Sequence, residues 1–256
     1  MREVRRLLNA AGMRCWGVLA RMIGARNLAV PHKVQRAQSV QYIKDCIYLA
    51  AELDGQLVSL APLTLGKLTP DAPPEEEWQW LVESMRHLYE YALEASVVLA
   101  IAPVNRYETY LLNRCEQALA LAQSVGPACG ICLDTFHMNL EETDPLEAMR
   151  LAGKRLTDFH VADNNRLACG MGTVDWKAIV NVLDEIGYDG ALTVEFVPRL
   201  DLVPAPAYDK VGLKRVQSAA PSSGEPIDLA QIDEAVYEFL VRESAGVLRP
   251  LIDLPS

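Results

Sequence analysis

The sequence predicts an α/β protein built on a parallel sheet. Short apolar runs alternate with longer amphipathic segments along most of the 256 residues, which is typical of strand-helix-strand units. About six such units follow one another along the chain. Near the end of three expected strands lies a residue that can hold a divalent metal ion, so candidate chemistry gathers at one edge of the predicted sheet.

Each expected strand is a short apolar run, and each is followed by a segment with helical periodicity. The expected strands are Met13 to Ala20, Gln56 to Pro62, Val97 to Asn105, Cys129 to Phe136, Arg155 to Ala162 and Ala191 to Val197. The expected helices are Arg2 to Ala11, Val34 to Leu53, Glu75 to Ala95, Leu111 to Val125, Pro145 to Ala152, Trp176 to Ile186 and Leu229 to Ala245.

Residues at the helix boundaries support several of these assignments. Asp144, Pro145 and Glu147 place a capping side chain, a first-turn proline and an acid in the order that a helix N-terminus favours. Three helices are followed by the residue that most readily ends a helix, at Gly126, Gly153 and Gly187.

A chain of this length can form one α/β barrel or two small domains. We expect one domain over residues 1–256, with a long loop over residues 202–226 before the last helix. A closed parallel barrel has eight strands, yet this chain opens directly on the helix Arg2 to Ala11. Two strands of such a barrel are therefore expected to be missing, and three explanations stay open: a start codon assigned too late, a degraded gene copy, or another chain that fills the gap.

Composition excludes several classes of partner. The net charge of -10 and the pI near 4.9 argue against nucleic acid, whose phosphates need clustered Lys and Arg. No apolar run approaches the roughly 20 residues that span a bilayer, and Met1 to Asn9 lacks the apolar core of a signal peptide. We therefore expect a cytoplasmic protein without a membrane partner, whose six cysteines are reduced and mostly buried.

Cys129 and Cys132 form a CxxC motif that imitates a redox site. In redox proteins this motif opens a helix, whose N-terminus lowers the pKa of a thiol. Here the motif lies in an expected strand, where residues three apart point to opposite faces. The two sulfurs are therefore not expected to pair, and the redox interpretation is disfavoured.

Three apolar stretches close on a potential metal ligand near the end of an expected strand: Cys129 to Asp134, Arg155 to His160 and Gly190 to Glu195. The residue that ends a barrel strand points into the mouth where substrates bind. Two carboxylates and one imidazole suit a divalent ion such as Mn²⁺, Mg²⁺ or Co²⁺. Taken singly, each residue has an ordinary structural explanation: a turn cap at Asp134, a satisfied core histidine at His160 and an ion pair at Glu195. Their shared position favours a metal site.

Further polar residues follow the same strand ends. The motifs are Asn-Arg-Tyr-Glu from Asn105 to Glu108, LDTFHMN from Leu133 to Asn139, FHVADNNR from Phe159 to Arg166, and GMGTVDW from Gly170 to Trp176. This combination closely resembles the xylose isomerase-like TIM-barrel superfamily and, within it, the D-tagatose 3-epimerase (ketose 3-epimerase) group. The resemblance runs from about Arg2 to Ile252, and it implies a TIM (β/α)8-type barrel that lacks its first two strands.

The resemblance also implies roles for individual residues. One divalent metal ion in that family is bound by Glu, Asp, His and Glu, and Asp134, His160 and Glu195 match the last three. Ala102 stands where the first glutamate is expected. Among the other matches, Glu195 corresponds to a proton-transferring glutamate, and the residues that contact the sugar correspond to Glu108, His137 and Arg166.

Three functions follow as competing hypotheses. The first is a metal-dependent sugar isomerase or epimerase that removes a proton next to a carbonyl, impaired because Ala102 can neither bind metal nor return a proton. The second is a non-catalytic sugar or metal binder descended from such an enzyme. The third is a dehydratase on the same scaffold, whereas the acidic charge disfavours a nuclease. The expected partner is a small sugar or polyol, and the family analogy suggests a homo-oligomer.

Overall fold

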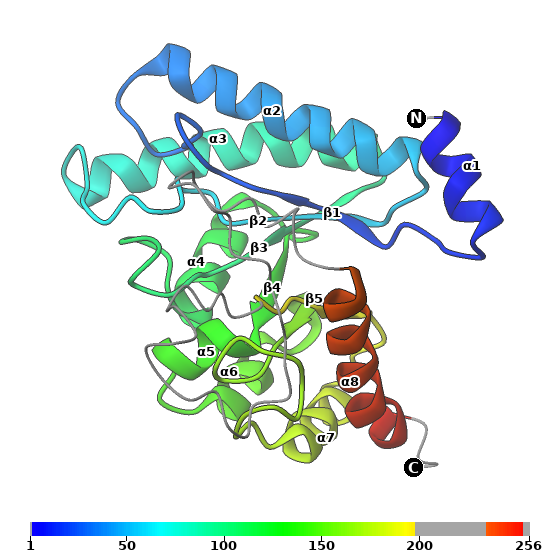
Figure 1. Cartoon of the computed structure of the whole chain (residues 1–256). Helices are drawn as coiled ribbons and strands as arrows, with labels where there is room; N and C mark the ends of the chain where they lie inside the picture. The colour runs from blue at the N-terminus through cyan, green and yellow to red at the C-terminus, as the bar shows by residue number, and fades with distance from the viewer. Residues whose placement is uncertain (1, 198–233, 253–256) are drawn as a thin grey trace, which may run out of the picture. The chain divides into compact units, whose positions relative to one another are not determined.

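The computed structural model describes residues 2–197 and 234–252, and the strands in these ranges confirm the α/β prediction. Six parallel strands follow one another in chain order across one sheet. Figure 1 labels the first five of them. The six strands are β1 (Gly17–Ala20), β2 (Leu57–Leu60), β3 (Val98–Ile101), β4 (Gly130–Asp134), β5 (Leu156–Val161) and β6 (Leu192–Val194). This sheet with its connecting helices is a partial TIM barrel.

Helices precede, connect and follow the strands. They are α1 (Arg2–Ala10), α2 (Lys33–Glu52), α3 (Pro74–Glu94), α4 (Cys115–Val125), α5 (Thr135–Glu141), α6 (Pro145–Ala152), the short 3-10 helix η1 (Gly153–Arg155), α7 (Trp176–Ile186) and α8 (Glu234–Ile252). The chain divides into two compact units. The first comprises Met1–His160 and Asn181–Thr193, and the second comprises Val161–Val180 and Val194–Ser256.

The core of the first unit lies between the sheet and its helices. Every residue of β2 and of β4 is buried. In Figure 1, α2 and α3 lie side by side over β1, β2 and β3. Their inward faces bury Ile43 and Ile47 of α2 and Leu81, Met85 and Leu88 of α3 completely. Apolar burial of this kind is the main stabilising contribution to the sheet that carries the candidate site.

Several expected boundaries were wrong, and each has a local cause. The strand expected over Cys129 to Phe136 ends at Asp134, because the Asp134 side chain accepts hydrogen bonds from the next backbone amides and begins α5, a helix that was not predicted. The strand expected over Val97 to Asn105 ends at Ile101. The last expected helix, Leu229 to Ala245, corresponds to α8, which begins at Glu234. The residues of the expected helix before Glu234 lie outside the described part of the chain. The loop expected over residues 202–226 lies outside it as well.

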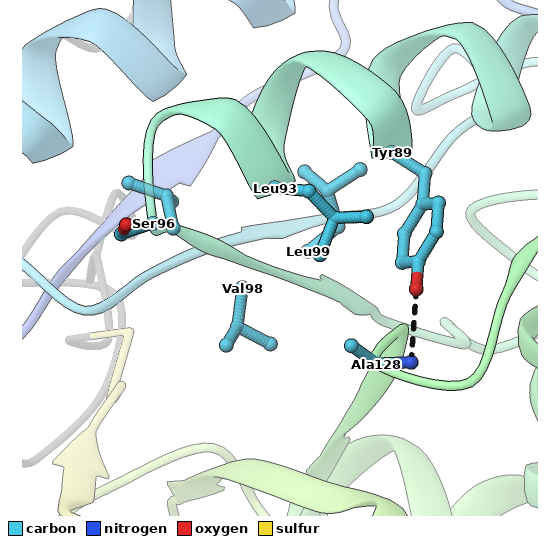
Figure 2. Close-up of a pocket in the computed structure, with 7 residues that line it drawn as sticks. Tyr89, Leu93, Ser96, Val98, Leu99 and Ala128 are labelled. Atoms are coloured by element: carbon cyan, nitrogen blue, oxygen red, sulfur yellow. Dashed lines mark hydrogen bonds between the residues drawn. The ribbon is translucent and has the colours of Figure 1, made fainter.

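A small cavity of about 190 Å³ lies beside α3 and the start of β3. Figure 2 shows the residues that line it. The Tyr89 hydroxyl accepts a hydrogen bond from the Ala128 backbone N–H over 3.1 Å, and Val98 and Leu99 add apolar lining. Substrates of parallel barrels bind at the other end of the strands. This cavity contains none of the predicted site residues, and we assign it no role.

Across the described part of the chain, no helix has both the length and the apolar character to cross a bilayer.

An irregularity between β4 and β5 sets the alignment of the candidate ligands. Ile131 pairs with Leu156, but Cys132 pairs with Asp158, so Thr157 is an extra residue on β5. This offset places Asp134 opposite His160. Without the extra residue, Asp134 would face Phe159, whose side chain is fully buried, because a slip of one residue exchanges the two faces of a strand.

Gly130 provides the space for Thr157. A Cβ atom at Gly130 would overlap the Thr157 side chain. We predict that Gly130→Ala lowers the free energy of unfolding by about 1–3 kcal/mol, the usual cost of overpacking. Urea titration would measure the loss, and Thr157→Ala in the same chain should recover part of it. Gly246→Ala in α8 is the matched control, because a Cβ there meets open space. Equal stability of Gly130→Ala and wild type would contradict this packing argument.

Candidate metal centre and the loop beside it

Asp134 and His160 end or nearly end the neighbouring strands β4 and β5. The two residues pair in register, and their potential ligand atoms lie within 4.8 Å of each other. Each residue is only 5% exposed. A buried carboxylate and imidazole at this spacing are ligand types that suit a divalent ion such as Mn²⁺, Mg²⁺ or Co²⁺. The structure thus brings together two of the three predicted ligands within the first unit.

Asp134 also has the structural role that its position allows. Its Oδ1 atom accepts hydrogen bonds from the backbone N–H groups of Phe136, over 2.7 Å, and of His137, over 3.2 Å. The turn-cap interpretation of Asp134 is therefore confirmed. It does not compete with metal binding, because a carboxylate has two oxygens and about four lone-pair sites.

His160 is held by a hydrogen-bonded network inside the first unit. Its Nε2 atom lies 2.9 Å from Oδ2 of Asp158. The Asp158 Oδ1 atom accepts hydrogen bonds from Trp16 Nε1, over 3.1 Å, and from the Thr193 hydroxyl, over 3.3 Å. Burial tends to raise the pKa of Asp158, but the hydrogen bonds from His160, Trp16 and Thr193 outweigh it and lower that pKa. Asp158 is thus a buried, ionised partner of His160.

Glu195 belongs to the second unit and directly follows β6. Its backbone N–H donates a 3.0 Å hydrogen bond to the carbonyl of Val161, the residue after His160 in the chain. The Glu195 carboxylate lies 3.9 Å from the Arg166 guanidinium. The ion pair that was the ordinary structural explanation of Glu195 is therefore present, with Arg166 as its partner.

Ala102 directly follows β3, the strand that neighbours β4 in the sheet. Its backbone N–H donates a 2.8 Å hydrogen bond to the Leu60 carbonyl, which extends the strand alignment to this residue. A methyl side chain offers neither a metal ligand nor an acidic proton.

Asn105 connects two of the predicted sugar-binding residues. Its side-chain nitrogen lies 2.9 Å from Nδ1 of His137, and the same nitrogen donates a 3.2 Å hydrogen bond to Glu108. The Asn105 backbone N–H also donates to His137 Nδ1 over 3.2 Å. Both Asn105 and His137 are buried. The structure therefore brings Glu108 and His137 together through Asn105. This linking role of Asn105 was not predicted from the sequence.

Arg166 lies on a loop of the second unit that is organised around Asp163. The Asp163 carboxylate is fully buried and accepts hydrogen bonds from the backbone N–H groups of Gly170, over 2.8 Å, and of Val174, over 3.1 Å. It also accepts from Trp176 Nε1 over 3.2 Å. Arg166 has a φ of 61°, in the left-handed region, and its backbone N–H donates to the Asp163 carbonyl over 2.8 Å. Asp163 thus fixes the loop that carries Arg166.

The CxxC segment behaves as the strand interpretation requires. Cys132 lies within β4, and both thiols are free and buried. Burial raises the pKa of Cys129 and that of Cys132 to about 12. Thiols with such a pKa are protonated at neutral pH and are poor nucleophiles, so the redox interpretation fails.

We predict that Asp163→Asn destabilises the protein by about 1.5–3 kcal/mol, the range for a hydrogen bond to a charged group. Burial raises the pKa of Asp163, but its backbone and Trp176 hydrogen bonds outweigh burial and lower that pKa below the ordinary 3.8. A lowered pKa gives stability that is complete above 3.8 and is lost as the pH falls through the lower folded value.

The difference in unfolding free energy between wild type and Asp163→Asn should therefore be large at neutral pH and shrink below pH 3.8. Urea titrations across this range would measure it. The exposed Asp184 of α7 supplies the control, Asp184→Asn, which should leave stability unchanged. A difference that stays constant with pH would contradict the assigned role of the Asp163 charge.

Comparisons with known proteins agree with this architecture. Residues 1–218 match the family model described as xylose isomerase-like TIM barrel. The chain is 44% identical over 115 residues to a D-psicose 3-epimerase of Enterocloster bolteae, covering 44% of this chain and 38% of the relative. It is 32% identical over 174 residues to an L-ribulose 3-epimerase of Mesorhizobium japonicum, covering 67% of this chain and 58% of the relative. The chain thus spans less than two thirds of these curated relatives.

Solved structures agree as well. A D-psicose 3-epimerase from Clostridium cellulolyticum H10, solved with D-tagatose, superposes with a TM-score of 0.80 at 24% identity, covering 99% of this chain and 83% of that one. A D-allulose 3-epimerase from Methylomonas sp., solved with D-allulose, gives a TM-score of 0.71 at 27% identity, covering 75% of this chain and 67% of that one. With its six-stranded parallel sheet and the match over residues 1–218, the chain belongs to the xylose isomerase-like TIM barrel family.

Proposed function

We propose that this chain is a metal-dependent sugar epimerase of the ketose 3-epimerase kind, in which Ala102 removes one of two proton-transferring carboxylates. The observation that carries the proposal is the register pairing of Asp134 with His160 at the ends of β4 and β5. Relatives named as D-psicose and L-ribulose 3-epimerases supply the reaction class.

The proposed ligands of the divalent ion are Asp134, His160 and Glu195. The first two have potential ligand atoms within 4.8 Å of each other, and Glu195 is hydrogen bonded through its backbone to the residue that follows His160. Mn²⁺, Mg²⁺ and Co²⁺ all suit such a mixed oxygen and nitrogen set. When bound, such an ion would polarise the sugar carbonyl and stabilise the negative charge that develops on it.

Glu195 is the proposed base. Its carboxylate would accept the proton from the carbon next to the carbonyl and return it to the same face. Arg166, 3.9 Å from Glu195, would hold a sugar oxygen beside this base. On the first unit, Glu108 and His137 share the side chain of Asn105 and would contact sugar hydroxyls. The proposed substrate is a small sugar or polyol.

Ala102 determines the outcome of that proton transfer. Inversion needs a second group that delivers a proton to the opposite face of the planar enediolate. The methyl group of Ala102 cannot do so, and delivery from water is slower than from a positioned acid. We therefore propose an enzyme that exchanges the substrate proton faster than it inverts the carbon.

Isotope exchange tests the proposed reaction directly. Incubated with Mn²⁺ and a ketohexose in heavy water, the protein should incorporate deuterium next to the carbonyl while forming little of the C3 epimer. Mass spectrometry and proton NMR of the recovered sugar measure the two outcomes. Glu195→Gln should abolish incorporation, because the amide cannot accept the proton. Absence of exchange with every ketohexose, from folded and metal-loaded protein, would reject the proposed activity.

Restoring the missing carboxylate tests the role of Ala102. We predict that Ala102→Glu raises the rate of C3 inversion by about 10² to 10⁴, the usual contribution of a positioned general acid or base. Ala102→Gln is the matched control, since it has the same size but no acidic proton, and it should not raise that rate. Equal rates of inversion for the two variants would show that position 102 does not supply the second proton.

Two other functions remain distinguishable from this one. Ala102 also favours a non-catalytic binder, which would show sugar or metal raising the melting temperature without exchange or turnover. A dehydratase begins with the same proton abstraction but loses water, so product analysis separates it.

Strand β1 ends the sheet order and pairs with β2 alone among the described strands, so its open edge favours self-association into a homo-oligomer.

A further inference from the structure

Asp158 faces the same side of β5 as His160, because residues two apart on a strand point to one face. Its Oδ2 atom lies 2.9 Å from Nε2 of His160, and the residue is only 2% exposed. Its side-chain partners His160, Trp16 and Thr193 belong to the first unit. This contact is not explained by the sugar chemistry proposed above.

Two side-chain donors on the other oxygen hold the Asp158 carboxylate in place. Trp16 Nε1 and the Thr193 hydroxyl both reach Oδ1 of Asp158, over 3.1 and 3.3 Å. An indole nitrogen can only donate, so Oδ1 is an acceptor. These two bonds come from the segment before β1 and from β6, and they prevent the carboxylate from rotating. The Oδ2 atom is therefore held facing His160, and an ionised carboxylate can only accept a hydrogen bond.

A neutral imidazole carries its hydrogen on one nitrogen and a lone pair on the other. If Nε2 donates to Asp158, the hydrogen is on Nε2 and the lone pair is on Nδ1. Only the nitrogen with the lone pair can bind a metal ion. The partner of Nε2 thereby decides which atom of His160 serves as ligand.

We propose that Asp158 is a positioning residue that holds His160 in the Nε2–H form, with Nδ1 as the ligand atom. The inference rests on the proposed metal site and adds to it the residue that prepares it. Carboxylates that orient a ligating histidine in this way typically contribute 10- to 100-fold to metal affinity.

A second arrangement of the same residues has to be separated from this one. Cys132, Asp158 and His160 also have potential ligand atoms within 4.8 Å of one another, so an ion could in principle bind to the Cys132 sulfur. Such an ion would have to displace the His160 hydrogen bond from Asp158, whose other oxygen is engaged by Trp16 and Thr193. The hydrogen-bonded network favours Asp158 as a support for His160, and cobalt spectroscopy distinguishes the two.

The variant Asp158→Asn keeps the shape of the side chain but reverses the direction of its hydrogen bond with His160. With its oxygen kept towards Trp16 and Thr193, the amide nitrogen would donate to His160 Nε2 and drive the ring hydrogen to Nδ1. Nitrogen-15 NMR of metal-free protein with labelled histidines measures which ring nitrogen of His160 carries the hydrogen. The chain has four histidines, and His160→Gln assigns the signal. We expect Nε2–H in wild type, Nδ1–H in Asp158→Asn, and a 10- to 100-fold weaker Mn²⁺ affinity in the variant.

Thr193→Val is the matched control. It removes one donor to Oδ1 but leaves the contact with His160, so the ring form and the Mn²⁺ affinity should stay close to wild type. Thermal unfolding of all variants, followed by circular dichroism, separates positioning from general loss of structure. Should Asp158→Asn not fold, the wild-type ring form still decides the matter, because Nδ1–H in wild type overturns the inference.

The remaining outcomes each decide a separate claim. An unchanged ring form and unchanged Mn²⁺ affinity in Asp158→Asn would overturn the positioning role. A near-ultraviolet thiolate band in the Co²⁺-loaded protein, lost in Cys132→Ser, would also overturn it by placing the ion on the sulfur. Wild-type protein that binds no Mn²⁺ would reject the proposed metal site, whereas the metal-free NMR measurement would still test the hydrogen bond to Asp158.

Discussion

The pairing of β4 with β5 is the constraint on which the candidate site depends. Thr157 is one residue more than regular pairing needs, and it moves His160 into line with Asp134. The extra residue fits because Gly130 on the partner strand has no side chain. A regular ladder would instead align Asp134 with the fully buried Phe159. An irregularity of one residue therefore separates a potential metal site from an ordinary apolar strand pair.

The residues at the strand ends combine structural and chemical roles. Asp134 begins α5 with one oxygen, and His160 contacts Asp158 with one nitrogen. Each group has a second atom of the type that metals bind, because carboxylates have two oxygens and imidazoles two nitrogens. The structural interpretation and the chemical one are therefore compatible. The cap and the buried hydrogen bond hold the two groups in fixed positions, as a preorganised metal site requires.

Much of the fold could be predicted from the sequence because its signals are local. Both ends of α6 and of α7 agree with the prediction, and α6 has a capping Asp144 before it and Gly153 after it. The ends of β3 and β4 were placed too late because an apolar residue such as Phe136 favours a strand as readily as a short helix. The extra residue on β5 could not be predicted, since a bulge depends on the partner strand.

In the candidate site too, residues marked by local signals could be predicted, whereas residues defined by distant partners could not. Asp134, His160 and Glu195 were predicted from their shared place near strand ends, and the family resemblance carried by short motifs indicated Glu108, His137 and Arg166. Asp158 was missed, because its partner Trp16 lies 142 residues away and a lone acid in an apolar strand gives no signal. Asp163 was quoted within a motif, but its role depends on backbone groups up to 11 residues further on. Partners distant in sequence are visible only once the chain is folded.

An anomalous difference map from a crystal soaked in Mn²⁺ tests the central claim most directly. The account predicts one manganese peak at the ends of β4 and β5, bonded to the Asp134 carboxylate and to the His160 imidazole. A map with no peak at that pair of residues, or with its peak on the Cys132 sulfur, would contradict it.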